Sequence, residues 1–272
     1  MADEQNMSFW EHLDVLRKVI WKSLIAAVVL AIAAFCFKDI LFGVLFAPSK
    51  SDFVLYRAMC RLAELTGWQS LCPGDFQAAF INTELVSQFM THMEVALWTG
   101  ACLASPYIIY LLYGFVAPAL YEQEKRHSLG IILSCVVLFL LGVLLNYFII
   151  FPFSFRFLST YQVQPEVINQ ISLSSYISTF LILSLLLGIM FEMPVLAYIL
   201  AKIGLLEDKL LCKYRKHAFV SICIVAAVIT PTGDAVTLML VTLPIYALYE
   251  LSIAIVRSVR KRSSQESLAG SE

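Results

Sequence analysis

Charged residues are scarce in this sequence of 272 residues. Aspartate, glutamate, lysine and arginine make up only 14% of the chain, whereas soluble domains carry about 25%. Hydrophobic residues make up 60%, and the mean hydropathy is +0.81. This composition excludes a disordered chain, a collagen-like chain and almost any soluble globular enzyme. It predicts a polytopic membrane protein.

The sequence also lacks the short motifs that metal binding or catalysis requires. It has no Cys-x-x-Cys or His-Glu-x-x-His spacing and no Gly-x-Ser-x-Gly elbow, and its four histidines are scattered. We therefore expect no metal, no cofactor and no intramembrane enzyme. Internal repeats, which many secondary transporters show, are missing too. No small-residue cleavage site follows an apolar core near the N-terminus, so we expect no cleaved signal peptide.

Apolar runs without charge dominate what is present. Six of them cover residues 23–37, 95–121, 128–155, 167–191, 218–233 and 235–249. A membrane span needs about 20 mostly apolar residues, and continuous rather than alternating hydrophobicity selects helices. The sequence predicts an all-α fold with six transmembrane helices, in a single membrane domain over residues 1–257. The last two runs are short, so either they extend past Glu250 or the bilayer thins around them.

The segments outside the runs predict the orientation of the protein. Most lysines and arginines fall on the side of the two termini, so the positive-inside rule places both termini in the cytoplasm. Residues 8–18 carry leucines at helical spacing and predict an amphipathic helix in the membrane interface. Residues 38–84 are expected to form a long outer loop. Residues 258–272, which end in a Ser-, Glu- and Gly-rich stretch, predict a disordered cytoplasmic tail.

Two of the seven cysteines, Cys60 and Cys72, share the long outer loop. The outer side of a bacterial inner membrane is oxidising, so we hypothesise a disulfide between them, with two free thiols as the alternative. Four other cysteines lie in the apolar runs, where cysteine is a small packing residue. They are Cys36, Cys102, Cys135 and Cys223.

Acidic residues inside the predicted spans are functional candidates, because ionisable groups at membrane depth are costly. Glu192 lies well inside the fourth span, directly after its charge-free run and two residues before Pro194, which predicts a kink in the helix. Glu250 follows the sixth charge-free run directly and lies inside the sixth span. Used together as a proton relay, Glu192 and Glu250 would favour a proton-coupled small-solute transporter. We interpret Glu94 as an interfacial residue and Asp234 as a helix N-cap.

Acidic residues also gather in two segments on the predicted cytoplasmic side. Glu11 and Asp14 precede the first run, and Glu122 and Glu124 follow the second, after Pro118. Carboxylates bind planar guanidinium groups through paired N–H···O bonds, so this side suits an arginine-bearing ligand. Solvated loop acids that pair with neighbouring lysines and arginines are the alternative.

Four segments, in order along the chain, resemble signatures of the TatC family, the core subunits of the twin-arginine protein translocase. They are Glu-His-Leu-Asp-Val-Leu-Arg at 11–17, Phe-Val-Ala-Pro-Ala-Leu-Tyr-Glu-Gln-Glu at 115–124, Phe-Glu-Met-Pro at 191–194 and Thr-Pro-Thr-Gly-Asp at 230–234. The resemblance runs from about Ser8 to Arg257. It implies a bacterial inner-membrane receptor, not an enzyme, for the twin-arginine signal peptides of folded cargo. It also implies homo-oligomers, TatA-like and TatB-like single-span partners, and transport driven by the proton motive force.

The resemblance also implies roles for individual residues at the cytoplasmic edge. The family's first-loop glutamate, which is implicated in holding the paired arginines, falls on Glu124. Phe115 is expected at the recognition surface or, alternatively, in an aromatic membrane belt. Arg17 closes the N-terminal signature, in which the family usually has glutamate where this chain has Val15.

Two further hypotheses follow from these family positions. We hypothesise that Glu11 or Asp14 supplies, with Glu124, the charge that Val15 lacks. Glu192 matches a glutamate that projects into the membrane cavity, and we interpret it as a polar contact for an inserted signal peptide or for a partner's span.

Overall fold

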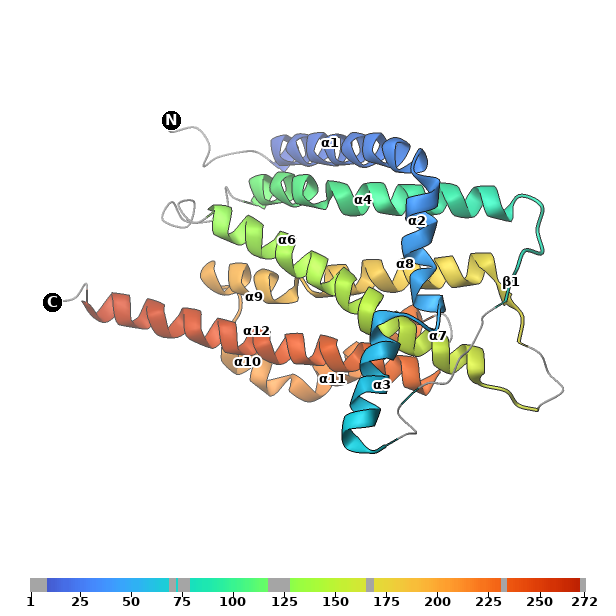
Figure 1. Ribbon diagram of the computed structural model, residues 1–272. Coiled ribbons are helices and arrows are strands. Elements are labelled where there is room, and N and C mark those ends of the chain that lie inside the picture. The colour runs from blue at the N-terminus through green and yellow to red at the C-terminus, as the bar shows by residue number, and fades with distance from the viewer. Residues whose placement is uncertain are drawn as a thin grey trace.

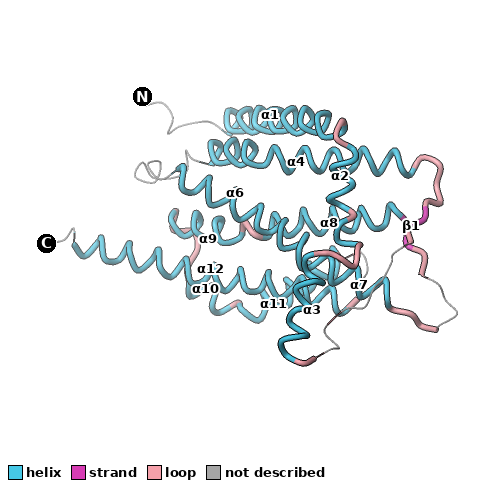
Figure 2. The backbone as a smooth tube through the Cα atoms, viewed as in Figure 1, coloured by secondary structure: helices cyan, strands magenta, loops and turns pink. Residues whose placement is uncertain are grey.

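The computed structural model describes residues 9–68, 72, 79–116, 128–164, 169–230 and 234–269, which are almost entirely helical (Figure 2). The long helices are α1 (Phe9–Phe35), α4 (Ser87–Val116), α6 (Ser128–Leu145), α8 (Leu173–Met190) and α12 (Ala235–Ala269). They run lengthwise through the molecule, and α1 begins at the end where α12 finishes (Figure 1). We call this the terminal end, and the opposite one the loop end.

Among the described residues, five helical segments are long and apolar enough to cross a membrane. They are Trp10–Phe35, Ser87–Phe115, Leu129–Thr160, Leu173–Lys202 and Ala235–Lys261. The predicted fold class, an all-α multi-pass membrane protein, is therefore confirmed. The remaining predicted span corresponds to α11 (Arg215–Ile229), whose 15 residues reach only about 23 Å, less than the hydrocarbon thickness of about 30 Å.

The last span is long rather than short, because α12 continues through Glu250 to Ala269. The prediction of a disordered tail from residue 258 is thus wrong as far as Ala269. Arg260 of α12 bonds to Asp208 (3.0 Å) and Glu207 (3.4 Å), which lie at the start of the short helix α10 (Asp208–Lys213). This contact holds the helix against the rest of the fold beyond the apolar run.

The predicted amphipathic helix over 8–18 is not a separate element. Residues Phe9–Phe35 form one helix, with no glycine or proline to interrupt it. The His12 ring in its first turn stacks on Phe115 at the end of α4, with ring centroids 4.2 Å apart. The N-terminal segment therefore continues the first span and packs along α4.

Small residues allow α1 and α4 to pack closely. A Cβ atom at Gly100 of α4 would lie 2.6 Å from the Ala27 carbonyl oxygen, and it would also meet the backbone of Ala31. Ala27 and Ala31 are both buried. Contacts between small residues are a usual way for membrane helices to associate, because lipid gives no hydrophobic driving force.

The predicted outer loop over 38–84 is largely helical. It contains α2 (Lys38–Leu45), the 3₁₀ turn η2 (Ala47–Ser49), α3 (Val54–Thr66) and β1 (Phe80–Ile81), which pairs in parallel with β2 (Ile171–Ser172). The buried Tyr56 hydroxyl of α3 lies within hydrogen-bonding distance of the carbonyl oxygens of Pro48 (3.2 Å) and Pro152 (2.9 Å). Burial raises the pKa of this phenol, so it remains a donor. These bonds attach α3 to α7 (Phe151–Thr160) at the loop end.

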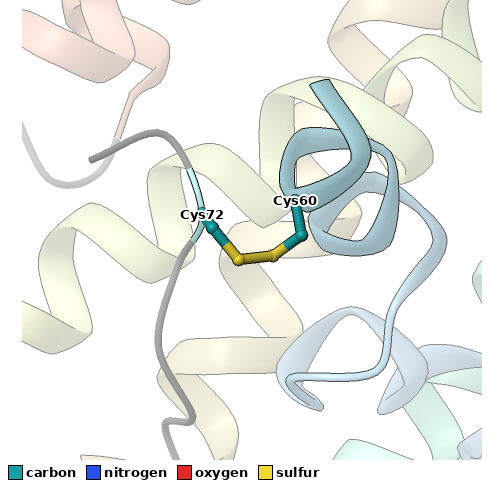
Figure 3. Close-up of a disulfide and its surroundings, with 2 residues drawn as sticks. All are labelled: Cys60 and Cys72. Carbon is teal, nitrogen blue, oxygen red and sulfur yellow. A yellow bond between two sulfur atoms is a disulfide. The ribbon is translucent and has the colours of Figure 1, made fainter. Parts of the chain in front are cut away.

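Cys60, on α3, and Cys72, in the segment that follows, are joined by a disulfide (Figure 3). The bond links positions 12 residues apart, so it closes a short loop. By chain entropy, closing a loop of this length stabilises the folded state by up to about 3 kcal/mol. The disulfide therefore holds the chain after α3 close to that helix.

We expect the purified protein to migrate faster on a denaturing gel before reduction than after it. Alkylation before reduction should leave Cys60 and Cys72 unlabelled, whereas Cys60→Ser should expose the Cys72 thiol to the reagent. Cys36, a free and exposed cysteine, is the labelling control. Labelling of both thiols in the unreduced wild-type protein would contradict the disulfide.

Candidate functional site

The fourth span is broken at Glu192. Helix α8 ends at Met190, residues Phe191 and Glu192 form a turn, and α9 (Met193–Lys202) begins with Pro194 as its second residue. Proline lacks a backbone N–H, so it is tolerated in a first helical turn but interrupts a continuing helix. The Glu192 carbonyl accepts the N–H of Val195 (3.1 Å), which restarts the helical ladder. Pro194 therefore interrupts the helix where the sequence predicts a kink.

A large cavity opens beside this break. Its volume is about 770 Å³, and its walls come from α2, α4, α6, α8 and α9. Most of the lining is aliphatic or aromatic. The polar or ionisable lining residues are Thr99, Cys102, Ser105, Tyr113, Cys135, Tyr147, Ser184 and Glu192.

Glu192 brings a polar atom without a partner to this cavity. Among the described residues, its Oε1 is buried and accepts no hydrogen bond, and the Ser105 Oγ on the same lining is also buried without a partner. Buried polar atoms are nearly always paired, so each such exception needs an explanation. Glu192 therefore keeps, at the wall of the cavity, one acceptor that no described residue uses.

Glu250 has a different environment. Arg215 donates to one carboxylate oxygen at 2.7 Å and the Tyr246 hydroxyl donates to the other at 3.0 Å. Glu250 is not part of the lining of the cavity that holds Glu192. Its two oxygens are occupied by α11 and α12 partners, so the structure does not bring Glu192 and Glu250 together as a proton relay.

The N-terminal signature and the end of α4 meet at the terminal end. The stack of His12 on Phe115 fixes which side of α1 faces α4. At about 100° per residue, Glu11 flanks that side, whereas Asp14 and Arg17 lie about 160° and 140° away from His12. Asp14 and Arg17 line a separate, shallow pocket on the outer face of α1. Of the two predicted N-terminal acids, Glu11 is therefore the one at the smaller angle from His12, about 100° against about 160° for Asp14.

Glu124 and Glu122 lie outside the described residues. Helix α4 ends at Val116, one residue after the Phe115 that stacks on His12, and α6 begins at Ser128. The connection between them carries both glutamates. Asp234 lies at the loop end, where its Oδ2 accepts the Thr237 N–H at 2.6 Å. It therefore caps the N-terminus of α12, as the sequence suggests.

Two polar groups were missed by the reasoning from sequence. Asn146 is fully buried in the π turn η5 (Asn146–Ile150), and its amide nitrogen donates to the Ser184 Oγ of α8 at 2.8 Å. A single asparagine inside a run of 28 apolar residues was the available signal. The contact of Asp208 with Arg260 was the other omission, because it joins positions 52 residues apart.

The Arg260 contact also acts on the charge of Asp208. Desolvation works to raise the pKa of this carboxyl, but the hydrogen bond and charge of Arg260 outweigh it and lower the pKa. Asp208 therefore stays ionised and keeps its ion pair with α12 at neutral pH.

No group of three or more His, Cys, Asp or Glu side chains that could hold a metal ion occurs within the part of the chain that the structure describes.

Comparisons with known proteins agree with this architecture. The family model described as Sec-independent protein translocase protein (TatC) matches residues 11–244. The TatC protein of Blattabacterium sp. subsp. Periplaneta americana is 36% identical over 96% of this chain and all of its own length. TatCy of Bacillus subtilis is 31% identical over 97% of this chain and 94% of its own length.

A solved structure extends the similarity to three dimensions. The crystal structure of a twin-arginine translocase receptor, TatC, superposes with a TM-score of 0.73 at 30% identity, covering 92% of this chain and all of the other. Neither the family nor the geometry of Glu250 supports a small-solute transporter. With a family model over most of its length and relatives that match nearly end to end, the chain belongs to the TatC family of core subunits of Sec-independent protein translocases.

Proposed function

We propose that this chain receives twin-arginine signal peptides at its terminal end, with Glu124 and Glu11 holding the arginines. The observation that carries the proposal is the stack of His12 on Phe115, which brings two signatures about 100 residues apart in sequence to one place. A guanidinium bound by two carboxylates forms strong, oriented hydrogen bonds. Asp14 and Arg17 face away from α4, so the proposal assigns arginine recognition to Glu11 rather than to Asp14.

The cavity at Glu192 is proposed as the second contact of the same function. Its lining is apolar apart from a few polar groups, which suits the apolar stretch of a signal peptide or the span of a small partner subunit. An unpaired carboxyl oxygen would accept a hydrogen bond from that segment. Such bonds between membrane helices contribute about 1 kcal/mol, enough to select one register.

The cellular arrangement is part of the proposal. The terminal end carries most of the basic residues, which supports a cytoplasmic location for both termini in a bacterial inner membrane. The disulfide at the loop end agrees with an oxidising outer compartment. TatA-like and TatB-like single-span proteins are the proposed partners, in a homo-oligomeric complex driven by the proton motive force.

We expect a photocrosslinker at position 123, beside Glu124 in sequence, to capture a signal peptide with paired arginines and not the same peptide with paired lysines. With the crosslinker at the same position, Glu124→Gln and Glu11→Gln should each lower capture at least tenfold, because each removes one carboxylate partner. Site-specific crosslinking in membrane vesicles measures both effects.

Asp14→Asn is the matched control, because it removes the same charge from the outer face of α1. Capture should remain within about twofold of wild type for that variant. Equal capture of the arginine and lysine peptides would remove the specificity claim. If Asp14→Asn abolished capture and Glu11→Gln had no effect, the assignment to Glu11 would be wrong.

A further inference from the structure

The outer face of α1 carries a basic pocket that the proposed function does not use. Five side chains of this helix surround a concavity of about 280 Å³: Asp14, Arg17, Lys18, Trp21 and Lys22. They follow the spacing i, i+3, i+4, i+7 and i+8, which places them on one helix face. Asp14, Arg17 and Trp21 lie about 140–180° from His12, which contacts α4. Lys18 and Lys22 lie about 120° and 80° from it, on the side of Glu11. Three of the five residues are basic and one is acidic, so the pocket attracts anions.

An apolar stripe continues the same face toward the loop end. Its residues are exposed in the isolated chain and follow the same helical spacing: Leu24, Ile25, Val28, Val29 and Ile32. In a membrane these side chains lie against acyl chains. The outer face of α1 is therefore basic near the terminal end and apolar toward the loop end. A phospholipid has the matching arrangement, with an anionic headgroup followed by apolar acyl chains.

The depth of the pocket matches the headgroup region. The charge-free run from residue 23 to residue 37 lies between Lys22 and Lys38, and its 15 residues span about 23 Å, less than the hydrocarbon thickness of about 30 Å. The backbone of Lys22 therefore lies just inside the hydrocarbon, and its side chain reaches the headgroups by snorkelling. Trp21, which is 56% exposed, has the amphipathic ring that favours this interface.

We propose that this pocket binds the phosphodiester of an anionic glycerophospholipid, with the acyl chains along the apolar stripe. Arg17, Lys18 and Lys22 contact the phosphate, and Trp21 lies against the glycerol backbone. Asp14 lowers the affinity for a bare phosphate dianion and accepts a hydrogen bond from a headgroup hydroxyl. The bound lipid lies on the outer face of α1 and begins one helical turn after Glu11.

The test compares lipid retention by the purified full-length protein in mixed micelles, measured by native mass spectrometry. We expect wild-type protein to retain phosphatidylglycerol in preference to phosphatidylcholine. The triple variant Arg17→Gln, Lys18→Gln, Lys22→Gln should lose at least about tenfold of this retention. The variant Arg17→Lys, Lys18→Arg, Lys22→Arg keeps the charge and should retain the lipid.

A second triple variant is the matched control. Lys209→Gln, Lys213→Gln and Lys216→Gln remove three charges from α10 and α11, which lie outside the pocket, and should leave retention unchanged. If both neutral triple variants lost the same amount of bound lipid, the retention would depend only on the net charge of the protein, and the proposed site would be wrong. Displacement of the lipid by millimolar inorganic phosphate, or equal retention of phosphatidylcholine, would also overturn it. The proposed function is tested separately, by capture of the signal peptide. The lipid site can therefore be wrong while the proposed function holds, and the reverse.

Discussion

Gly100→Leu is expected to destabilise the protein by about 3 kcal/mol or more and to lower its thermal unfolding midpoint by about 5–10 °C. A Cβ at this position would meet the backbone of Ala27 and Ala31, which cannot rotate away as a side chain can. The helices α1 and α4 must therefore separate. Thermal unfolding of the detergent-solubilised protein, followed by size-exclusion chromatography, measures the shift.

Gly114, in the same helix, provides the control. A Cβ there meets nothing within 4 Å, so Gly114→Leu should leave the midpoint within a few degrees of wild type. Equal midpoints for Gly100→Leu and wild type would show that α1 and α4 tolerate a wider separation than the structure has. The glycine would then not be required for their packing.

Glu192→Ala is expected to weaken binding of the segment that enters the cavity about three- to tenfold, with little change in the thermal midpoint. The loss corresponds to one hydrogen bond between membrane helices. Folding should be little affected, because Oε1 has no partner among the described residues and the carboxyl otherwise loses one hydrogen bond, with Cys135. Co-purification of single-span partners and export of a twin-arginine reporter measure the binding loss.

The variant Glu192→Gln distinguishes two possible roles of Glu192, as a hydrogen-bond acceptor and as a proton carrier. Glutamine keeps a carbonyl acceptor, so this variant should retain most of the assembly, whereas a proton relay would be lost. Leu196→Ala, on the same cavity lining, is the control for a change of volume without loss of the carboxyl. Unchanged export and complex size in Glu192→Ala would contradict the proposed contact.

Local chemistry explains why some features were predictable. Pro194 predicts a break in the fourth span, because proline removes a donor wherever it stands in a helix. Asp234 predicts an N-cap from its place before an apolar run, and the structure has that cap. The disulfide was only a hypothesis, because sequence shows that two cysteines share a loop but not how close they lie. In each case the signal lay within a few residues of the feature.

Features that depend on distant partners were not predictable in this way. Glu192 and Glu250 look alike in sequence, since each is one acid that directly follows a charge-free run. In the structure Glu250 is paired with Arg215, whereas Glu192 lies on a cavity. Composition predicts a disordered tail after residue 258, yet α12 continues to Ala269 and its Arg260 contacts Glu207 and Asp208 at the start of α10.

The sequence by itself determined the class of the protein, its apolar runs and the side on which basic residues gather. These follow from transfer of each side chain between water and lipid, which composition and order along the chain describe. Only the tertiary structure decided that His12 meets Phe115, that Asp14 faces away from α4, and which intramembrane acid keeps an unpaired oxygen. Those outcomes depend on how helices far apart in sequence pack, and packing sets the partners of each polar group.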